Sequence, residues 1–331
     1  MLRARRGPFD PFKLTWILTE ACSQRCSSCH LWREPASGPD LATVRSVVAA
    51  NPQLTWVNLS GGDFVERADA PDVVDAVASG FPDLALLDFP TAGQDVDATL
   101  AALQPALDSD VPRIVVTVSL DGPDEVHDRV RGSRGSAARA RSTLRALQRI
   151  RRRGFSALAG MTLSRHNLGE VDDPLALLPR DIAAADLHLN LAHHSDHYYR
   201  NAQDVVPNPV AALAVIDAQQ RRRGPALSPL AWMEARYWRL ARRFVTTGDV
   251  GGACAALRAS VYLAADMTAY PCTIHDRPIG SLAQVGHELR RLSEFSAAHD
   301  ALADADQQRC AKCWSPCEAF PTLLVGLGRP R

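Results

Sequence analysis

Eight cysteines are the residues of this sequence best suited to chemistry, and they fall into two groups. The N-terminal group has the spacing Cys-x3-Cys-x2-Cys, and the other five follow after a long stretch without cysteine. The groups are Cys22, Cys26 and Cys29, and then Cys254, Cys272, Cys310, Cys313 and Cys317. The short N-terminal loop can wrap three thiolates around one metal centre. Three thiolates leave a coordination position open, which is typical of a site that binds and transforms a ligand.

A structural zinc site is the alternative for both groups. His30 directly follows Cys29 and could close a zinc site in the N-terminal loop. In the C-terminal region, the stretch from Val261 to Cys272 has the pattern of a strand, a turn and a second strand that ends in cysteine. Such a hairpin brings its flanking cysteines together, as in a zinc ribbon.

Short apolar runs alternate with amphipathic stretches along the first two-thirds of the chain, which indicates a parallel sheet with crossover helices. The predicted strands are Leu14–Leu18, Leu54–Leu59, Leu84–Phe89, Ile114–Val118, Leu158–Leu163 and Leu187–Leu191. The predicted helices are Asp40–Ala50, Pro71–Ser79, Asp95–Leu107, Ser136–Arg153, Pro174–Ile182, Pro209–Arg222 and Pro229–Phe244.

The chemistry-bearing residues follow the predicted strands at the edge where parallel α/β proteins place their sites. The first strand ends at the cysteine loop and the second at Gly61-Gly62-Asp63. The third ends at Thr91-Ala92-Gly93 and the fourth at Ser119-Leu120-Asp121-Gly122. Paired glycines let a ligand approach the backbone closely, and serine and aspartate offer hydrogen-bonding partners.

Composition excludes several classes of protein. The 331 residues carry 37 basic and 37 acidic side chains, so a net charge of zero gives no argument for nucleic acid or an anionic membrane as partner. The arginine-rich stretch 129–153 fits a solvated helix face, because it has no aromatic residues to stack on bases. The N-terminus is not typical of a signal peptide, and no apolar run is long enough for a membrane span. We therefore expect a cytoplasmic protein, in which clustered cysteines bind metal.

The sequence resembles the radical S-adenosylmethionine (SAM) superfamily over about Thr15 to Leu191. The resemblance rests on the cysteine triplet, on Gly61-Gly62-Asp63 and on the run from Ser119 to Gly132. It implies an α/β fold, a partial (β/α)6 barrel whose three cysteines hold a [4Fe–4S] cluster. The open iron of that cluster would bind SAM and, once reduced, cleave it to a 5′-deoxyadenosyl radical that abstracts a hydrogen atom from the substrate.

The resemblance also implies which residues contact SAM. These are Gly61, Gly62 and Asp63 for the amino group, Ser119, Asp121 and Arg131 for the ribose and carboxylate, and Thr162 and Ser164 at the fifth strand. Two positions depart from the usual pattern. Asp63 replaces a glutamate, and Ser28 replaces an aromatic residue, whose adenine contact His30 or Trp32 could supply.

The C-terminal region resembles the twitch domain, a shortened relative of the SPASM domain. We expect residues 1–250 to form the barrel with its following helices, and residues 251–331 to form a small α+β domain with a β-hairpin. The resemblance implies one auxiliary [4Fe–4S] cluster held by Cys254, Cys272, Cys310 and Cys313. Cys317 is then left over, as an alternative ligand, a buried thiol or a hydrogen-atom donor in catalysis.

The polar run after the sixth strand predicts a substrate pocket, with His193, His194, His197 and Tyr198 as its candidate residues. Alternation along the strand means that half or more of such residues point elsewhere. A mononuclear metal site built from these histidines is a minor alternative.

These inferences predict a radical SAM oxidoreductase that acts on a small polar natural product, such as a sugar or aminocyclitol. It would oxidise an alcohol carbon with the auxiliary cluster as electron acceptor, and would need an external one-electron reductant of the flavodoxin or ferredoxin type. The alternatives are an epimerase in which Cys317 donates hydrogen, a peptide-modifying maturase, and a non-catalytic Fe–S or zinc protein. A small substrate is favoured because only 13 residues precede the first predicted strand, which leaves no room there for a peptide-recognition domain.

Overall fold

A single nine-stranded sheet organises the chain, in the order β6-β5-β4-β3-β2-β1-β7-β8-β9. The structure is a computed structural model that describes residues 7–35, 37–201, 205–225, 229–252, 254–310 and 312–327. The strands are β1 (Lys13–Ile17), β2 (Trp56–Ser60), β3 (Leu86–Thr91), β4 (Arg113–Ser119), β5 (Phe155–Leu163), β6 (Leu187–Leu191), β7 (Ser260–Leu263), β8 (Thr268–Tyr270) and β9 (Gly280–Ser281). Neighbouring strands from β6 through β1 to β7 are parallel. The predicted α/β class and all six predicted strands are confirmed.

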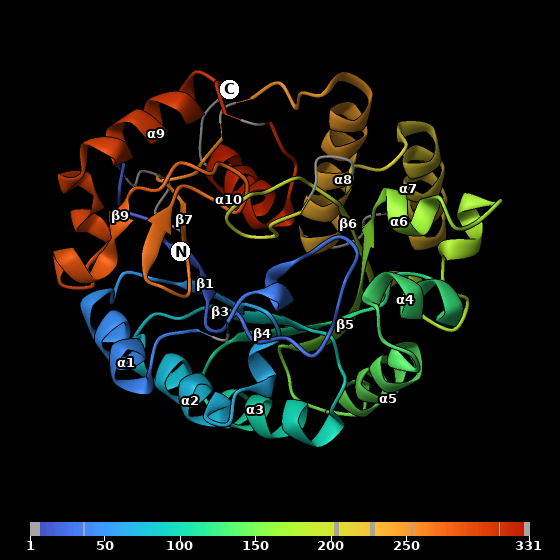
Figure 1. Cartoon of the computed structure of the whole chain (residues 1–331), viewed down its shortest axis with the longest axis horizontal. Helices are drawn as coiled ribbons and strands as arrows, with labels where there is room; N and C mark the ends of the chain where they lie inside the picture. The colour runs from blue at the N-terminus through green and yellow to red at the C-terminus, as the bar shows by residue number, and fades with distance from the viewer. Residues whose placement is uncertain are drawn as a thin grey trace.

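Helices cover both faces of the sheet. They are α1 (Leu41–Ala50), α2 (Ala70–Gly80), α3 (Val96–Asp108), α4 (Asp124–Arg131), α5 (Ser136–Gln148), α6 (Arg165–Leu168), α7 (Pro209–Arg223), α8 (Pro229–Thr247), α9 (Ser296–Asp306) and α10 (Pro316–Leu327). Helices α1, α2, α3 and α5 line the outer side of the curved sheet, whereas α8 and α10 lie on its inner side (Figure 1). None of the described helices is both long enough and apolar enough to cross a membrane.

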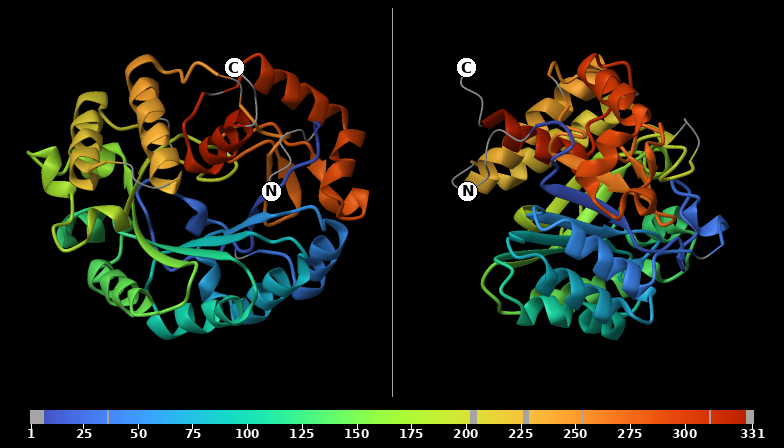
Figure 2. Two further views of the ribbon diagram at one scale, coloured as in Figure 1. Left: turned by 180° about the vertical axis from the view of Figure 1, so that it is seen from behind. Right: turned by 90° about the vertical axis from the view of Figure 1, so that its left-hand side faces the viewer.

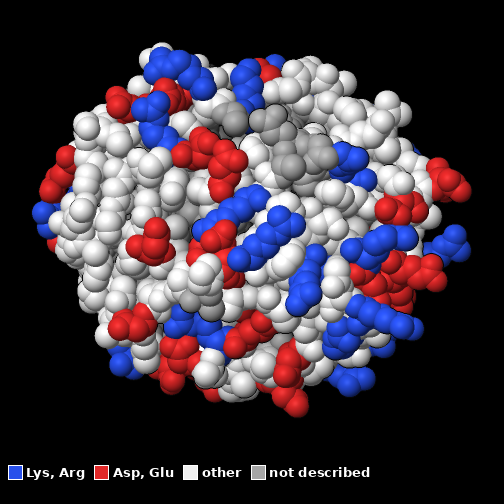
Figure 3. Space-filling model, viewed as in Figure 1, with Lys and Arg blue, Asp and Glu red and all other residues white. Residues whose placement is uncertain are grey.

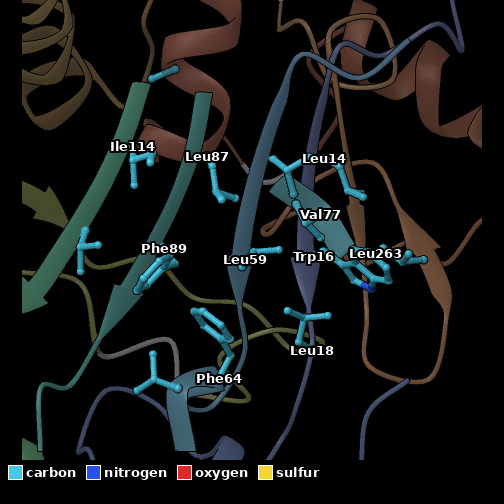
Figure 4. Packing of buried hydrophobic residues seen from close by; sticks show 14 of the residues in the cluster. Leu14, Trp16, Leu18, Leu59, Phe64, Val77, Leu87, Phe89, Ile114 and Leu263 are labelled. Atoms are coloured by element: carbon cyan, nitrogen blue, oxygen red, sulfur yellow. The ribbon is translucent and has the colours of Figure 1, made fainter. Parts of the chain in front are cut away.

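Strand alternation divides the sheet into an apolar outer face and a polar inner face. On β1, Leu14 and Trp16 belong to the main hydrophobic core, and the residues that alternate with them are Lys13, Thr15 and Ile17, of which Ile17 packs in a separate small cluster. Figure 4 shows Leu14 and Trp16 packed beside Val77 of α2 in this core. Burial of such apolar side chains is the dominant favourable term in folding. The core therefore holds the outer helices in place and leaves the inner face for polar groups.

Two of the predicted helices differ from the observed structure. The predicted helix Pro174–Ile182 is wrong, because only a short 3-10 turn, Pro174–Leu177, forms there. Leu178 is extended, with ψ of 118°, because it precedes Pro179, and a proline disfavours the helical conformation of the residue before it. The predicted helix Ser136–Arg153 begins where expected and ends earlier, at Gln148. Helices α4, α6, α9 and α10 were not predicted.

The C-terminal region continues the barrel sheet. Strand β7 pairs in parallel with β1, with Lys13 opposite Ser260, and β7, β8 and β9 form the predicted hairpin and one further strand. Figure 2 shows helix α9, in orange-red, along the outer edge of the molecule. The division into residues 1–250 and 251–331 stays a prediction, and the hydrogen-bonded sheet runs across it.

Surface charges of both signs are interspersed on the face drawn in Figure 3. Several arginines of the basic stretch 129–153 have protein partners. Arg141 pairs with Asp124 and Asp181, and Arg152 donates to the backbone carbonyls of Leu107, Ser109 and Val111. The sequence suggests that this stretch forms a solvated helix face. These contacts show that some of its arginines also have a structural role.

Candidate functional site

The glycine pair after β2 lets the cysteine loop pack against the backbone of that strand end. The amide of Gly62 donates to the carbonyl of Thr19 at 2.8 Å, and the amide of Asp63 donates to the carbonyl of Ala21 at 3.0 Å. A Cβ at Gly62 would lie 2.0 Å from the Ala21 oxygen, and one at Gly61 would lie 2.3 Å from the Thr19 oxygen. The glycines therefore make room for the cysteine loop itself, a contact that the sequence did not reveal.

The three N-terminal cysteines influence one another electrostatically. The thiol of Cys26 contributes to raising the pKa of both Cys22 and Cys29. Burial is the larger cause, and it raises the pKa of Cys22 to about 12 and that of Cys29 to about 11. All three side chains are partly exposed. The metal-free loop therefore holds protonated thiols, and metal binding would release those protons.

Helix α4 docks the cysteine loop from the other side. Its last carbonyls, at Val130 and Arg131, accept hydrogen bonds from the amides of Ser27 (2.8 Å) and Arg25 (2.9 Å). The helix ends at Gly132, which has a φ of 61°, and a Cβ there would lie 2.4 Å from the Arg25 oxygen. The last carbonyls of α4, which have no partner inside the helix, thus accept hydrogen bonds from the cysteine loop. These hydrogen bonds fix the position of the loop against the helix.

Asp121, Arg131 and Thr162 come together beside this loop, as predicted for residues of one binding site. The Nε of Arg131 donates to Oδ2 of Asp121 at 2.7 Å, and the amide of Thr162 donates to Oδ1 at 2.9 Å. The Nη1 of Arg131 lies 3.9 Å from the sulfur of Cys26. Burial raises the pKa of Cys26, and the nearby guanidinium acts in the opposite direction.

Asp63 accepts hydrogen bonds at only one of its two carboxylate oxygens. Its Oδ2 accepts from the Thr91 hydroxyl at 2.9 Å and from the Ala92 amide at 2.8 Å. Its Oδ1 is buried, with no partner in the described part of the chain. Burial raises the pKa of this carboxyl to about 7. A buried carboxylate oxygen without a partner suits an ammonium group, which carries only donors.

The two predicted serines differ in their surroundings. Ser119 ends β4 and is partly exposed, in a strand where buried and partly exposed residues alternate. Ser164 is buried and caps helix α6: its Oγ accepts from the His166 amide at 3.2 Å and donates to Asn167 Oδ1 at 3.3 Å. These interactions give Ser164 a helix-capping role, and its cofactor contact stays a prediction.

Four C-terminal cysteines, the predicted Cys254, Cys272, Cys310 and Cys313, gather in one place. Cys254 and Cys313 raise the pKa of Cys272, and Cys310 raises the pKa of Cys254 and of Cys313, beyond the larger effect of burial. The Sγ of Cys272 accepts from the amides of Ile274 (3.4 Å) and His275 (3.2 Å), and that of Cys254 from the Ala256 amide (3.4 Å). Amide donors of this kind stabilise thiolate ligands.

Cys317 has other charged neighbours than cysteines among the main influences on its pKa. Burial raises its pKa, and the charged groups that also act on it are Lys13, Glu318 and Asp88. The buried ammonium of Lys13 donates to the Cys317 carbonyl at 2.5 Å and lies 4.6 Å from the Trp56 ring centre. The Cys317 side chain is partly exposed. The division of the cysteines into three, four and one stays a prediction.

Two of the predicted substrate residues are engaged with the protein itself. The Nε2 of His197 lies 2.9 Å from the Cys272 carbonyl, and its ring stacks on Tyr270 with centroids 4.2 Å apart. Burial lowers the pKa of His197 to about 4, so the neutral ring donates to that carbonyl. The Tyr198 hydroxyl lies 3.0 Å from Ser60 Oγ. His197 thus holds the Cys272 loop, and its contact with substrate stays a prediction.

The other two predicted substrate residues, His193 and His194, differ in their surroundings. His193 is buried edge-on against Phe244, with centroids 5.5 Å apart, and burial lowers its pKa to about 4. His194 is partly exposed, and its Nε2 lies 3.1 Å from Asp196. The polar run therefore does not form one pocket wall.

Sequence reasoning missed two supports of the cysteine loop. Glu66 accepts from the amide (3.0 Å) and the hydroxyl (2.5 Å) of Ser23. His127 links Asp121 to the loop: its Nδ1 accepts from the Asp121 amide at 3.1 Å, and its Nε2 lies 3.1 Å from Ser136 Oγ, which donates to Gln24. The only signal in the sequence for these two residues was their position near the motifs. Glu66 lies three residues after Asp63, and His127 lies inside the run from Ser119 to Gly132.

Among the described residues, no three histidine, cysteine or acidic side chains are placed to hold a single metal ion. The thiolates of a [4Fe–4S] cluster bind four different irons, so such a cluster spaces its ligands more widely than one ion does. The two cysteine groups fit that donor set.

Curated relatives of the chain are named as maturation and biosynthesis proteins. The mycofactocin maturase MftC of Mycobacterium ulcerans is 33% identical over 176 residues, which cover 51% of this chain and 45% of MftC. The sporulation killing factor maturation protein SkfB of Bacillus subtilis is 23% identical, over 85% of this chain and 66% of SkfB. The subtilosin biosynthesis protein AlbA of the same species is 26% identical, over 64% and 44%. The chain thus spans about half the length of most of these relatives, and no protein-family profile matches it.

Solved structures share the fold. The structure of anSMEcpe with bound AdoMet and a Cp18Cys peptide has a TM-score of 0.63 at 12% identity, over 96% of this chain and 95% of that one. Streptococcus suis SuiB bound to precursor peptide SuiA has a TM-score of 0.51 at 13% identity, over 83% and 60%. At this identity the likeness concerns the fold alone. Taken with the cysteine motif, the glycine pair and the parallel sheet, these similarities support the resemblance of the chain to the radical SAM superfamily and to its members with a SPASM or twitch C-terminal region.

Proposed function

We propose that the chain is a radical SAM enzyme that modifies a peptide. The observation that carries the radical chemistry is the unpartnered, buried Oδ1 of Asp63 beside the cysteine loop. The names of MftC, AlbA and SkfB support the peptide substrate, as does the peptide bound in the structures of anSMEcpe and SuiB. The alcohol oxidation of a sugar or aminocyclitol, favoured by the sequence alone, has no support among these relatives.

The residues fit the cofactors that this function needs. Cys22, Cys26 and Cys29 would hold one [4Fe–4S] cluster, and the four C-terminal cysteines would hold an auxiliary one. SAM bound at the first cluster supplies a 5′-deoxyadenosyl radical that removes a hydrogen atom from the substrate. The reductant would be an external flavodoxin or ferredoxin. Eight free thiols suit a reducing compartment such as the cytoplasm.

Each side chain at the strand ends has a proposed task. Asp63 binds the amino group of SAM through Oδ1, and needs to be ionised to do so. Arg131 binds the SAM carboxylate with the donors that Asp121 leaves free, because a guanidinium carries five N–H groups. Ser119 and Thr162, both partly exposed on neighbouring strands, would contact the ribose. Gly61 and Gly62 act indirectly, by letting the cysteine loop reach this position.

Peptide epimerisation is a second candidate, favoured by the position of Cys317. Its thiol is left over from the predicted four-cysteine group, is partly exposed and affects the pKa of Tyr198, on which Cys29 also acts. After the radical has removed a hydrogen atom from a peptide carbon, the Cys317 S–H would return one to the opposite face. The thiyl radical left on Cys317 would then take one electron from the external reductant and one proton from solvent.

The test is turnover of peptides encoded beside this gene, with anaerobically reconstituted protein, SAM and reductant. We expect 5′-deoxyadenosine formation that depends on the peptide, together with a modified peptide in the mass spectrum. The matched control is a Cys22→Ala, Cys26→Ala, Cys29→Ala variant, which should form neither. Oxidation of aminocyclitols or sugars with no peptide turnover would contradict the proposal.

The same reactions run in D2O separate the two candidates. Epimerisation adds one deuterium at an intact C–H bond, and Cys317→Ala should abolish that exchange while hydrogen abstraction continues. A new cross-link or a loss of mass, with no deuterium gained, favours another peptide modification.

A further inference from the structure

One segment, residues 193–201, contacts both cysteine groups; we call it the bridge segment. At its C-terminal end it holds the N-terminal cysteine loop by three hydrogen bonds. The amide and Nδ1 of His30 meet the carbonyls of Tyr199 (2.8 Å) and Arg200 (3.0 Å). The side-chain amide of Asn201 donates to the carbonyl of Ser28 at 2.9 Å. These contacts fix the chain on both sides of Cys29.

The middle of the bridge segment holds the loop of Cys272, a predicted ligand of the auxiliary cluster. His197 donates from Nε2 to the carbonyl of Cys272 at 2.9 Å, and the Ser195 hydroxyl donates to the carbonyl of Thr273 at 2.7 Å. The ring of Tyr199 packs in a cluster with Cys254, Cys272 and Cys313. The bridge segment thus contacts the backbone of one predicted ligand and packs against others.

Internal hydrogen bonds make the bridge segment stiff. The buried side chain of Asn201 accepts from the Ser195 amide at 3.0 Å and donates to the His193 carbonyl at 3.0 Å. The Ser195 hydroxyl, which holds Thr273, also accepts from the Tyr198 amide at 3.1 Å. Asn201 and Ser195 therefore each belong to an external contact and to the internal fold of the segment. A displacement at one end has little room to relax before it reaches the other.

We propose that the bridge segment couples the two cysteine sites, so that filling the C-terminal site tightens SAM binding at the N-terminal one. This inference rests on the proposed function for the identity of the two cofactors. Ordering the Cys272 loop fixes His197 and Ser195, and through Asn201 and Tyr199 this fixes the chain around Cys29. Coupling between sites is reciprocal, so SAM binding would in turn stabilise the C-terminal site.

The test measures the SAM dissociation constant of anaerobically reconstituted full-length protein by calorimetry without reductant. His197→Phe keeps a ring to stack on Tyr270 and removes the donor to Cys272. Ser195→Ala removes the donor to Thr273 and serves if the first variant does not fold. We expect each variant to weaken SAM binding by about fivefold or more, within the usual range of coupling between sites. The SAM-induced change in the electron paramagnetic resonance spectrum of the N-terminal cluster should shift to higher SAM concentration as well.

Thr322→Val is the matched control. The Thr322 hydroxyl accepts from the Ala255 amide at 3.1 Å, so the variant disturbs the Cys254 side of the C-terminal site without touching the bridge segment. In samples whose C-terminal iron content equals that of the wild type, the SAM affinity of Thr322→Val should equal the wild-type value. Unchanged affinity in His197→Phe and Ser195→Ala overturns the coupling, and so does an equal loss in Thr322→Val. Wild-type protein that binds no SAM would instead contradict the proposed function.

Discussion

The guanidinium of Arg131 lies between two parts of the candidate site, with Nη1 3.9 Å from the sulfur of Cys26 and Nε 2.7 Å from Oδ2 of Asp121. The Asp121 side chain is 3% exposed and that of Arg131 is 17% exposed, so the pair is shielded from water. The carboxylate holds the guanidinium in one orientation and counteracts the effect of burial on it, so the pKa of Arg131 is raised overall. One side chain thus joins the cysteine loop to the end of β4.

Two substitutions of Arg131 distinguish the effect of its positive charge from the effect of its planar guanidinium group. Arg131→Met leaves the buried Asp121 carboxylate without its partner and should lower the free energy of unfolding by roughly 3 kcal/mol. Arg131→Lys keeps the charge without the planar fork, so we expect a smaller loss of stability and weakened SAM binding. Chemical denaturation and SAM titration measure the two effects. Equal stability of Arg131→Met and wild type would contradict this role.

Gly62→Ala should disrupt the cysteine loop. The added methyl group would lie 2.0 Å from the Ala21 oxygen and 2.9 Å from the Cys22 Cβ, so the loop has to move away. We expect loss of iron from the N-terminal site and retention of iron at the C-terminal one. Gly326→Ala is the control, because a Cβ at that position has nothing within 4 Å. Full iron content in Gly62→Ala would show that the close approach has no consequence.

SAM binding should strengthen as the pH rises through about 7. The pKa of Asp63 is raised from 3.8 to about 7 by burial, and only the ionised carboxylate attracts an ammonium group. Calorimetric titration with SAM between pH 6 and 8 measures this dependence. Asp63→Asn should bind SAM weakly over the whole range, and a pH dependence that persists in this variant would assign it to another group.

The raised pKa of Asp63 also makes the folded SAM-free protein less stable as the pH rises, whereas SAM binding becomes stronger. With a folded-state pKa of about 7 against the ordinary 3.8, the folded SAM-free protein keeps a proton that the unfolded chain loses. The Asp63 contribution to the free energy of unfolding therefore falls as the pH rises from about 4 to about 7, and is constant above that. Asp63→Asn should flatten this part of the stability profile, which urea denaturation at several pH values measures.

Much of the barrel could be predicted from the sequence, because its signals are local. Alternation and apolar runs located all six parallel strands, and strand order along the chain placed the cysteine loop, Asp63 and Asp121 at one edge. The error at Pro174–Ile182 is local as well, since Pro179 was there to be read. Helix α10, which lies inside the molecule, has Pro321 within it and gives a weak helical signal.

The contacts that hold the site together join residues distant in sequence. Such contacts could not be predicted from the sequence. His197 was expected to meet substrate because it is polar and follows β6, whereas its partner is the carbonyl of Cys272. Lys13 gave no signal of its own, yet it lies buried against the carbonyl of Cys317, 304 positions away. A side chain's type predicts what it can bind, but its partner depends on how the strands and loops pack.

The central claim is that Cys22, Cys26 and Cys29 hold the cluster at which SAM is cleaved. Its most direct test is to measure iron and 5′-deoxyadenosine per chain after anaerobic reconstitution and reduction, with and without these three cysteines. We predict about eight irons and 5′-deoxyadenosine from the wild type, and about four irons with none from the triple alanine variant. Zinc in place of iron, or full iron loading without any cleavage of SAM, would contradict the account.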